Sequence, residues 1–123
     1  MKVAIPKERR ANERRVAASP DTIKKYKQLG LDVVVETGAG KEASIPDQAF
    51  ADAGATIAPD EASALSDADI VLKVQRPLTE AEGGPDELAL MKPGAMLVAI
   101  LQPYQQRDQI QAYAYAKVNA FAM

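Results

Sequence analysis

The 123-residue sequence contains no cysteine and no histidine. Without cysteine it can form neither a disulfide framework nor a thiolate metal site, which fits a reducing compartment. Without histidine it lacks the side chain that most often serves as general acid or base and as metal ligand. No pair of carboxylates and no nucleophile–base arrangement can be assembled from the remaining residues. The sequence therefore predicts no metal site and no catalytic residue in this chain.

Long hydrophobic runs and an excess of one charge are also lacking. The longest apolar stretch, 95–101, is too short to cross a bilayer, and the arginines within 9–15 interrupt any signal-peptide pattern. A net charge of −2 gives no general attraction to nucleic acid or to an anionic membrane. The hydrophobic content of 47% and the charged content of 26% are typical of a single globular domain.

What the sequence does contain is a regular alternation of strand-like and helix-like segments. Short apolar runs predict strands at 3–5, 31–36, 55–58, 69–74, 95–101 and 118–123. Helix-start residues or helical spacing predict helices at 20–29, 46–53, 59–65 and 104–116, and a broken helical segment at 78–92. This rhythm predicts an α/β fold with a doubly wound, mainly parallel sheet, flavodoxin-like or Rossmann-like, with helices on both faces.

Two of the helices have apolar positions that indicate which side packs on the sheet. Ser19 and Pro20 are typical of a helix N-terminus, and Gly30 is typical of the residue after a helix ends. The side chains expected to face the sheet are Ile23, Tyr26 and Leu29 in the first helix and Ile110, Tyr113 and Ala114 in the last.

In a doubly wound sheet, ligands bind beyond the carboxyl ends of the strands. The charged side chains expected to converge there are Arg14, Arg15, Lys73 and Arg76. Together they predict a cationic opening suited to a carboxylate or phosphate ligand. Two other interpretations stay open. The basic run 7–15 is also typical of a solvated loop, and Lys73, at the end of a buried strand, could need its charge for a structural partner.

Gly38 and Gly40 follow a predicted strand, as the glycines of a dinucleotide-binding fingerprint do. The segment after them is polar, and the next glycine is Gly54, so the third glycine of the fingerprint is missing. We therefore interpret residues 37–40 as a tight turn and not as a phosphate cradle.

Several spaced motifs carry a family resemblance. They read IPKE at 5–8, NERRVAASP at 12–20, VETGAG at 35–40, AGA at 53–55, LKVQRPL at 72–78, PGAMLVAILQP at 93–103 and AFAM at 120–123. Together they resemble the N-terminal domain shared by alanine dehydrogenases and pyridine-nucleotide transhydrogenases. One departure is Ala4, where the family usually has glycine. The resemblance spans essentially the whole chain.

The resemblance implies three candidate residues that line a cleft: Arg15, Lys73 and Gln102. In alanine dehydrogenases an arginine and a lysine matching Arg15 and Lys73 hold the keto acid, and a histidine after the apolar strand is the acid/base. This chain has Gln102 in that context, and a neutral amide cannot carry the proton that such chemistry requires. The transhydrogenase branch needs no such residue, because hydride passes directly between two nicotinamides. The resemblance is therefore closer to the NAD(H)-binding component, or alpha subunit, of proton-translocating NAD(P) transhydrogenases.

The same resemblance implies the setting in which the chain works. Residues 1–123 would be the N-terminal subdomain of a component whose GxGxxG dinucleotide-binding subdomain is absent from this chain, so NAD binding by this chain alone is expected to be weak. An apolar end at Met123, without a polar turn, also predicts a piece of a longer protein. Implied partners are a second copy of the component, an NADP-binding component and membrane subunits, with a cytoplasmic location at the inner membrane. The alternatives are an alanine dehydrogenase-like oxidoreductase and a non-catalytic flavodoxin-like binding or assembly module.

Overall fold

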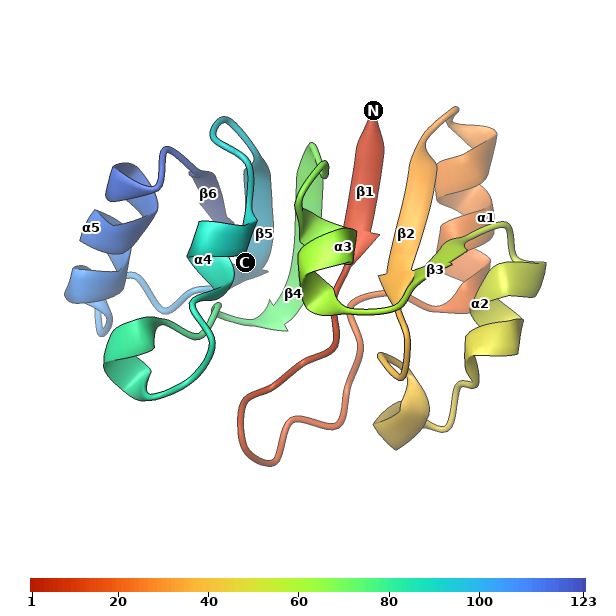
Figure 1. Ribbon diagram of the computed structural model, residues 1–123, viewed down its shortest axis with the longest axis horizontal. Helices are drawn as coiled ribbons and strands as arrows, with labels where there is room; N and C mark the ends of the chain where they lie inside the picture. The colour runs from red at the N-terminus through yellow and green to blue at the C-terminus, as the bar shows by residue number, and fades with distance from the viewer.

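The computed structural model describes residues 1–123 as one six-stranded sheet with helices on both faces (Figure 1). All neighbouring strands are parallel, in the order β3-β2-β1-β4-β5-β6. The strands are β1 (Lys2–Ile5), β2 (Asp32–Glu36), β3 (Thr56–Ala58), β4 (Ile70–Gln75), β5 (Met96–Ile100) and β6 (Asn119–Ala122). This order reverses direction between β1 and β4, which is the switch point of a doubly wound fold. The predicted fold class is confirmed.

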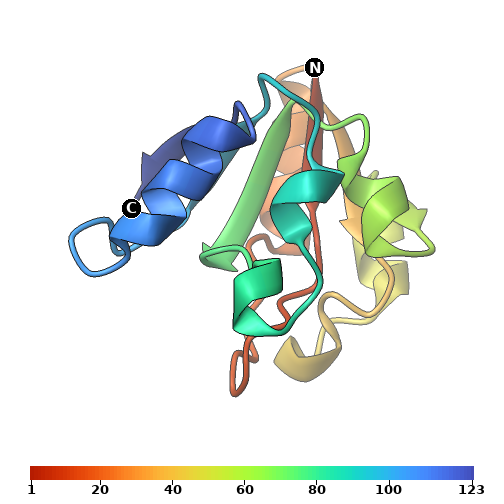
Figure 2. The same cartoon turned by 60° about the vertical axis from the view of Figure 1, so that its left-hand side comes forward.

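The helices divide between the two faces of the sheet (Figures 1 and 2). α1 (Pro20–Gln28) and α2 (Asp47–Asp52) lie on one face, and α3 (Glu61–Leu65), α4 (Glu87–Leu90) and α5 (Arg107–Tyr115) lie on the other. Two single 3₁₀ turns, η1 (Lys41–Ala43) and η2 (Glu80–Glu82), follow β2 and β4. The longest helices have nine residues, and none is long and apolar enough to span a bilayer.

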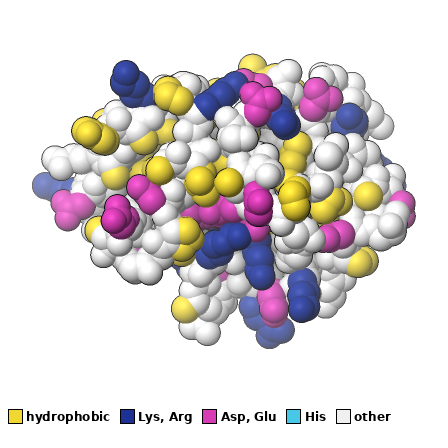
Figure 3. All heavy atoms as spheres, viewed as in Figure 1, with side chains coloured by type: hydrophobic (Ala, Val, Ile, Leu, Met, Phe, Trp, Pro, Cys, Tyr) yellow, Lys and Arg dark blue, Asp and Glu magenta, His cyan; other side chains and the backbone are white.

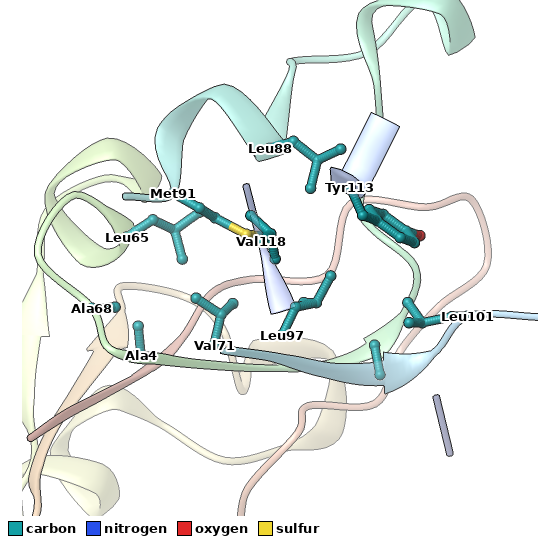
Figure 4. Close-up of a cluster of buried hydrophobic side chains, with 11 residues drawn as sticks. Ala4, Leu65, Ala68, Val71, Leu88, Met91, Leu97, Leu101, Tyr113 and Val118 are labelled. Carbon is teal, nitrogen blue, oxygen red and sulfur yellow. The ribbon is translucent and has the colours of Figure 1, made fainter. Parts of the chain in front are cut away.

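Each face of the sheet buries its own hydrophobic cluster. Figure 4 shows the cluster under α3, α4 and α5, which joins Val71 of β4 and Leu97 of β5 to side chains from all three helices, Leu65, Leu88 and Tyr113. The cluster on the other face joins β1 and β2 to α1 and α2, with Phe50 fully buried at its centre. Val34 points away from it, to a small cluster with Ala58 and Ala64. The β-branched run of β2 is therefore buried on both faces, as parallel strands require.

The start of α1 agrees with its sequence-based prediction better than its buried face does. Ser19 caps α1, because its Oγ accepts the N–H of Thr22 at 3.2 Å. Ile23 is buried as predicted, but Leu29 is 75% exposed, because α1 ends at Gln28 and Leu29 lies beyond its last turn.

The expected buried face of α5 is also partly wrong. Tyr113 is buried, whereas Ile110 and Ala114 are exposed. The second buried residue is Gln109, which lies one turn before Tyr113. The side-chain amide of Gln109 donates to Glu82 Oε1 at 2.8 Å. A hydrogen bond to a carboxylate outweighs apolar periodicity here.

The broken segment 78–92 is two short pieces, η2 and α4, because Gly83 ends η2 in the left-handed conformation with φ of 78°.

One side of the sheet is only half covered. α1 and α2 pack over β1 and β2, while the same face of β4 and β5 keeps partly exposed apolar side chains from Leu72, Val74, Val98 and Ile100. Next to them, β6 is exposed throughout, with Phe121 53% exposed. We call the 460 Å³ hollow over these strands the Arg15 pocket, because Arg15 lies at its edge.

The turn after β2 gives a test of packing. A Cβ at Gly40 would lie 2.6 Å from the backbone oxygen of Ile45 and 2.7 Å from Cε2 of Phe50, so Gly40→Ala forces backbone or a core ring to move. We expect a loss of about 1–3 kcal/mol in the free energy of unfolding, measured by urea denaturation. The control is Gly38→Asn in the same turn. Gly38 has open space around it, and asparagine tolerates its positive φ, so the loss should be smaller; equal losses would contradict this account.

Candidate functional site

Charged side chains gather where β1, β2 and β4 end. The loop 6–19, which follows β1, hangs below the sheet in Figure 1, and Figure 3 shows Lys, Arg, Asp and Glu side chains interleaved along that edge. We call this set the strand-end network. Its cations are Arg9, Arg10, Arg15, Lys73 and Arg76, and its carboxylates are Glu8, Glu13, Glu36, Glu61, Glu82 and Glu87.

Lys73 lies at the centre of the network, buried between two carboxylates. Its Nζ is 3.3 Å from Glu8 Oε2 and 3.4 Å from Glu87 Oε2, and all three side chains are almost fully buried. Both carboxylates also accept hydrogen bonds from the backbone. Glu8 accepts the N–H groups of Val74 and Gln75 at 3.2 and 2.9 Å, and Glu87 accepts that of Leu78 at 2.6 Å. Each buried charge therefore has both an opposite charge and hydrogen bonds, which is the condition for burying it.

Arg9 ties a second pair of carboxylates to the same place. Its Nη1 donates to Glu61 at the start of α3 at 2.7 Å and to Glu36 at the end of β2 at 2.9 Å. Glu36 also accepts the backbone N–H of Lys7 at 3.1 Å. The loop after β1 is thus fastened to the neighbouring strand and to the helix on the opposite face.

The buried part of the network holds more carboxylates than cations. Its carboxylates are Glu8, Glu36, Glu61 and Glu87, and its cations are Lys73 and Arg9. Burial, together with a hydrogen bond and the negative charge of Glu87, raises the pKa of Glu61 to about 8. This pKa favours the protonated form of Glu61 at neutral pH, which lowers the excess of negative charge among the buried carboxylates.

Arg15 is the most accessible cation of the network. Its Nε and Nη2 lie 2.9 and 2.8 Å from the two oxygens of Glu13, and its side chain is 64% exposed. The hydrogen bonds from Arg15 lower the pKa of Glu13 to about 2, so this carboxylate is charged throughout the physiological range. Gln75 also donates to Glu13 at 2.9 Å, which fixes the orientation of the pair.

The three cleft-lining candidates are not all in one place. Arg15 and Lys73 both line the Arg15 pocket, together with Tyr26 and apolar residues of β4 and β5. Gln102 does not line it. Gln102 follows the end of β5, is exposed, and has a φ of 50° in the left-handed region.

The expectation of a cationic opening is wrong. Lys73 is enclosed by two carboxylates, Arg76 lies 3.3 Å from Glu82, and the exposed Arg14 lies 3.7 Å from Glu42. The carboxylates that neutralise these cations were missed, along with the roles of Arg9 and Arg10. Arg10 donates to Glu82 at 2.8 Å and to the backbone oxygen of Arg76 at 2.7 Å. The sequence contained a signal for this neutralisation, because Glu8 and Glu36 occur inside the same family motifs as the basic residues.

The residues of this chain do not fit the pyrophosphate of a dinucleotide. In the turn 37–40 the backbone N–H of Gly38 already donates to Asp47 at 2.9 Å, and Thr37 Oγ1 donates to the same carboxylate at 2.6 Å. At α1, the loop from β1 contains no glycine, and Ser19 occupies the cap. The interpretation of 37–40 as a structural turn is confirmed.

A wholly parallel sheet with this strand order, its reversal between β1 and β4 and a charged network at the strand ends define a Rossmann-like α/β domain. Residues 4–123 match the family model described as alanine dehydrogenase/PNT, N-terminal domain. The chain therefore belongs to this family, and the resemblance found in its motifs is confirmed.

Comparisons with individual proteins favour the transhydrogenase branch. An NAD(P) transhydrogenase subunit alpha polypeptide of Rhodospirillum rubrum is 54% identical over all 123 residues, which make up 32% of that protein. The crystal structure of a transhydrogenase from Sinorhizobium meliloti superposes with a TM-score of 0.90 at 42% identity, over 99% of this chain and 33% of that one. An L-alanine dehydrogenase structure superposes with a TM-score of 0.89 at 30% identity, over 99% of this chain and 32% of that one. The chain thus spans about a third of the length of these relatives.

The buried position of Lys73 leads to a stability prediction. Lys73→Met leaves Glu8 and Glu87 without their shared cation, which should cost about 3–5 kcal/mol of unfolding free energy by urea denaturation. Adding Glu87→Gln to this variant should recover part of the loss, because one buried charge is removed. Arg14→Met is the matched control, and since its exposed ion pair is 3.7 Å long, we expect a change within about 0.5 kcal/mol. Similar effects of Lys73→Met and Arg14→Met would refute the assignment.

The proton on Glu61 leads to a prediction of pH dependence. Because the pKa is about 8 in the folded state and about 4.5 unfolded, the folded chain holds a proton that the unfolded chain has lost between these values. The contribution of Glu61 is complete below pH 4.5 and falls as pH rises to 8. Glu61→Gln should reduce the slope with which the unfolding free energy declines between pH 5 and 8. The reduction should correspond to the uptake of about one proton. Glu13 and Glu82, whose pKa values are both about 2, titrate outside this window. Identical slopes for the two proteins would disprove the raised pKa of Glu61.

Proposed function

We propose that this chain is the N-terminal portion of the NAD(H)-binding alpha subunit of a proton-translocating NAD(P) transhydrogenase. The complete enzyme would transfer hydride between NAD(H) and NADP(H), and this chain would form one wall of the cleft that holds NAD(H). The observation that carries the proposal is the identity of the second residue after β5, Gln102. The 54% identity to a transhydrogenase alpha subunit over the whole chain supports it.

Gln102 lies just beyond the carboxyl end of β5, an internal parallel strand, at the edge of the sheet where ligands of doubly wound folds bind. Its left-handed backbone is held by its own carbonyl oxygen, which accepts the N–H groups of Gln105 and Gln106 at 3.1 and 3.0 Å. Non-glycine residues adopt such a conformation where the surroundings require it, and these positions cluster at functional sites. An amide at this point can orient a ligand by hydrogen bonds but cannot exchange a proton at neutral pH. That suits direct hydride exchange better than the chemistry of an amino acid and its keto acid.

The two cations that line the Arg15 pocket have different roles in this proposal. Arg15 is accessible and is oriented by Glu13, so it can contact a bound cofactor directly. Lys73 is enclosed by Glu8 and Glu87 and fixes the floor of the same wall. The half-covered sheet beside them supports a role within a larger assembly, because apolar faces of this kind are normally packed against further structure.

The rest of the proposal follows from the family. NAD would be gripped mainly by a separate GxGxxG subdomain outside residues 1–123, and NADP by a partner component. The alpha subunit would form a homodimer, and it would be held at the cytoplasmic side of the inner membrane by its partner subunits. None of these partners is a nucleic acid.

An alanine dehydrogenase-like activity is the second candidate. It is favoured by the position of Arg15 and Lys73 around one pocket, as substrate clamps would be, and by the similarity to an L-alanine dehydrogenase structure. Oxidation of NADH that depends on a keto acid, by the complete protein, would favour this candidate. Hydride exchange between NADH and an NADP analogue would favour transhydrogenase.

Cofactor binding tests the proposal directly. Calorimetry on the 123-residue chain should detect no NAD(H) binding at micromolar concentrations, because its turns do not fit a pyrophosphate. In the complete alpha subunit, Arg15→Ala should weaken NAD(H) binding and raise the KM for NAD(H) about tenfold, the loss of one charge-assisted contact. Arg14 is an equally basic and exposed neighbour of Arg15. Arg14→Ala should therefore leave NAD(H) binding and the KM for NAD(H) unchanged. Micromolar NAD(H) binding by the short chain, or an Arg15→Ala subunit with unaltered affinity and transhydrogenation, would contradict the proposal.

A further inference from the structure

A second surface, which adjoins the strand-end network but is lined by other residues, has the features of a peptide-binding groove. It lies between α4 and α5 on the outer side of their helical layer and has a volume of about 750 Å³. We call it the α4–α5 groove. Leu88 and Met91 lie beneath its floor and are buried in the hydrophobic core of that face, and the accessible apolar floor comes from Ala89, Pro93 and Ala112. At the left of the view, Figure 3 shows hydrophobic side chains with acidic and a few basic side chains around them.

The acidic residues of the groove differ from those of the strand-end network. Glu80, Asp86 and Asp108 line it, all three are exposed, and none has a lysine or arginine within 4 Å. No lysine or arginine lines the groove at all. In a chain of net charge −2, three uncompensated carboxylates around one apolar floor create a local field that attracts cations.

The wall formed by α5 presents a regular helical surface. The residues of α5 that line the groove are Asp108, Gln111, Ala112 and Tyr115, followed by Ala116 at its C-terminal cap. This spacing of three and four residues is one face of a helix. Tyr115 is 93% exposed at the edge of this face. An exposed tyrosine beside an apolar floor is a typical anchor of protein interfaces.

We propose that the α4–α5 groove is a docking site for a cationic amphipathic helix of a partner protein. The apolar face of such a helix would cover Ala89, Pro93 and Ala112, and its lysines or arginines would pair with Glu80, Asp86 and Asp108. One face of α5 beside an apolar floor is a geometry that accepts an amphipathic helix laid in a groove. The sign of the charge argues against phosphate, nucleic acid and anionic lipid as occupants. The proposal does not depend on the activity proposed above.

A labelled peptide tests this docking. The probe is a short fluorescein-labelled helical peptide with leucines spaced three and four residues apart and lysines beside them; the control peptide has glutamate for lysine. We expect the 123-residue chain to bind the lysine peptide in fluorescence polarisation, more weakly as salt is raised, and not to bind the glutamate peptide. The double variant Glu80→Lys/Asp108→Lys should weaken binding at least tenfold, and Tyr115→Ser severalfold. Asp52→Lys, at the exposed end of α2, is the matched charge control and should change nothing.

Three outcomes would overturn the proposal. The first is equal binding by the chain and the Glu80→Lys/Asp108→Lys variant. The second is loss of binding in Phe121→Ser instead, which would locate the peptide on the half-covered sheet. The third is self-association of the chain in sedimentation experiments that the peptide abolishes, because the groove would then be filled by the lysine-bearing α1 of a second copy. Since all the substituted side chains are largely exposed, thermal unfolding can verify that each variant folds.

Discussion

Burying the ammonium group of Lys73 is the constraint on which the carboxyl edge of the sheet depends. A charge in that position is tolerated only if opposite charges and hydrogen bonds surround it. Glu8 meets that need by turning the loop after β1 back over the end of β4, and Glu87 meets it by placing the start of α4 beneath the same strand. The path of the loop and the position of a helix on the α3–α5 face thus follow from one lysine. Polar groups here specify a geometry that apolar packing alone would leave loose.

The same network explains why a loop so rich in arginine is not an open anion site. Arg9 and Arg10 act as internal ties, to Glu36 and Glu61 on one side and to Glu82 on the other. Arg15 differs, because its partner Glu13 is buried while its own guanidinium faces solvent. A cation held this way is oriented in advance, so a ligand that contacts it need not order a flexible side chain. Of the several cations in the network, Arg15 is therefore the one whose charge is accessible to a ligand.

Much of the fold could be predicted from the sequence, since each strand coincides with an apolar run and many boundaries with a proline, glycine or capping residue. Local signals are sufficient for this, as Ser19 at the start of α1 illustrates. The strand order is not local, and neither are the partners of the cations. Glu8 and Lys73 lie 65 positions apart, and Arg9 and Glu61 lie 52 apart. Predicting basic residues at the strand ends was therefore possible, whereas predicting their neutralisation required knowing which distant carboxylates the topology brings to the same edge. The buried Gln109 shows the same limit, because its partner Glu82 belongs to a different element.

The edge position of β6 has a consequence for how the chain opens. β6 hydrogen-bonds to β5 on one side only, and its residues are exposed, whereas β1 has a neighbour on both sides and mostly buried side chains. Local stability should therefore decrease across the sheet, with the amides of β6 the first to become accessible to solvent exchange and those of β1 among the last. The chain would then behave as a firm centre with a loosely attached last strand. A structure that packs against β6 would therefore stabilise the least stable strand of the sheet. It would do so without changing the arrangement of the central strands.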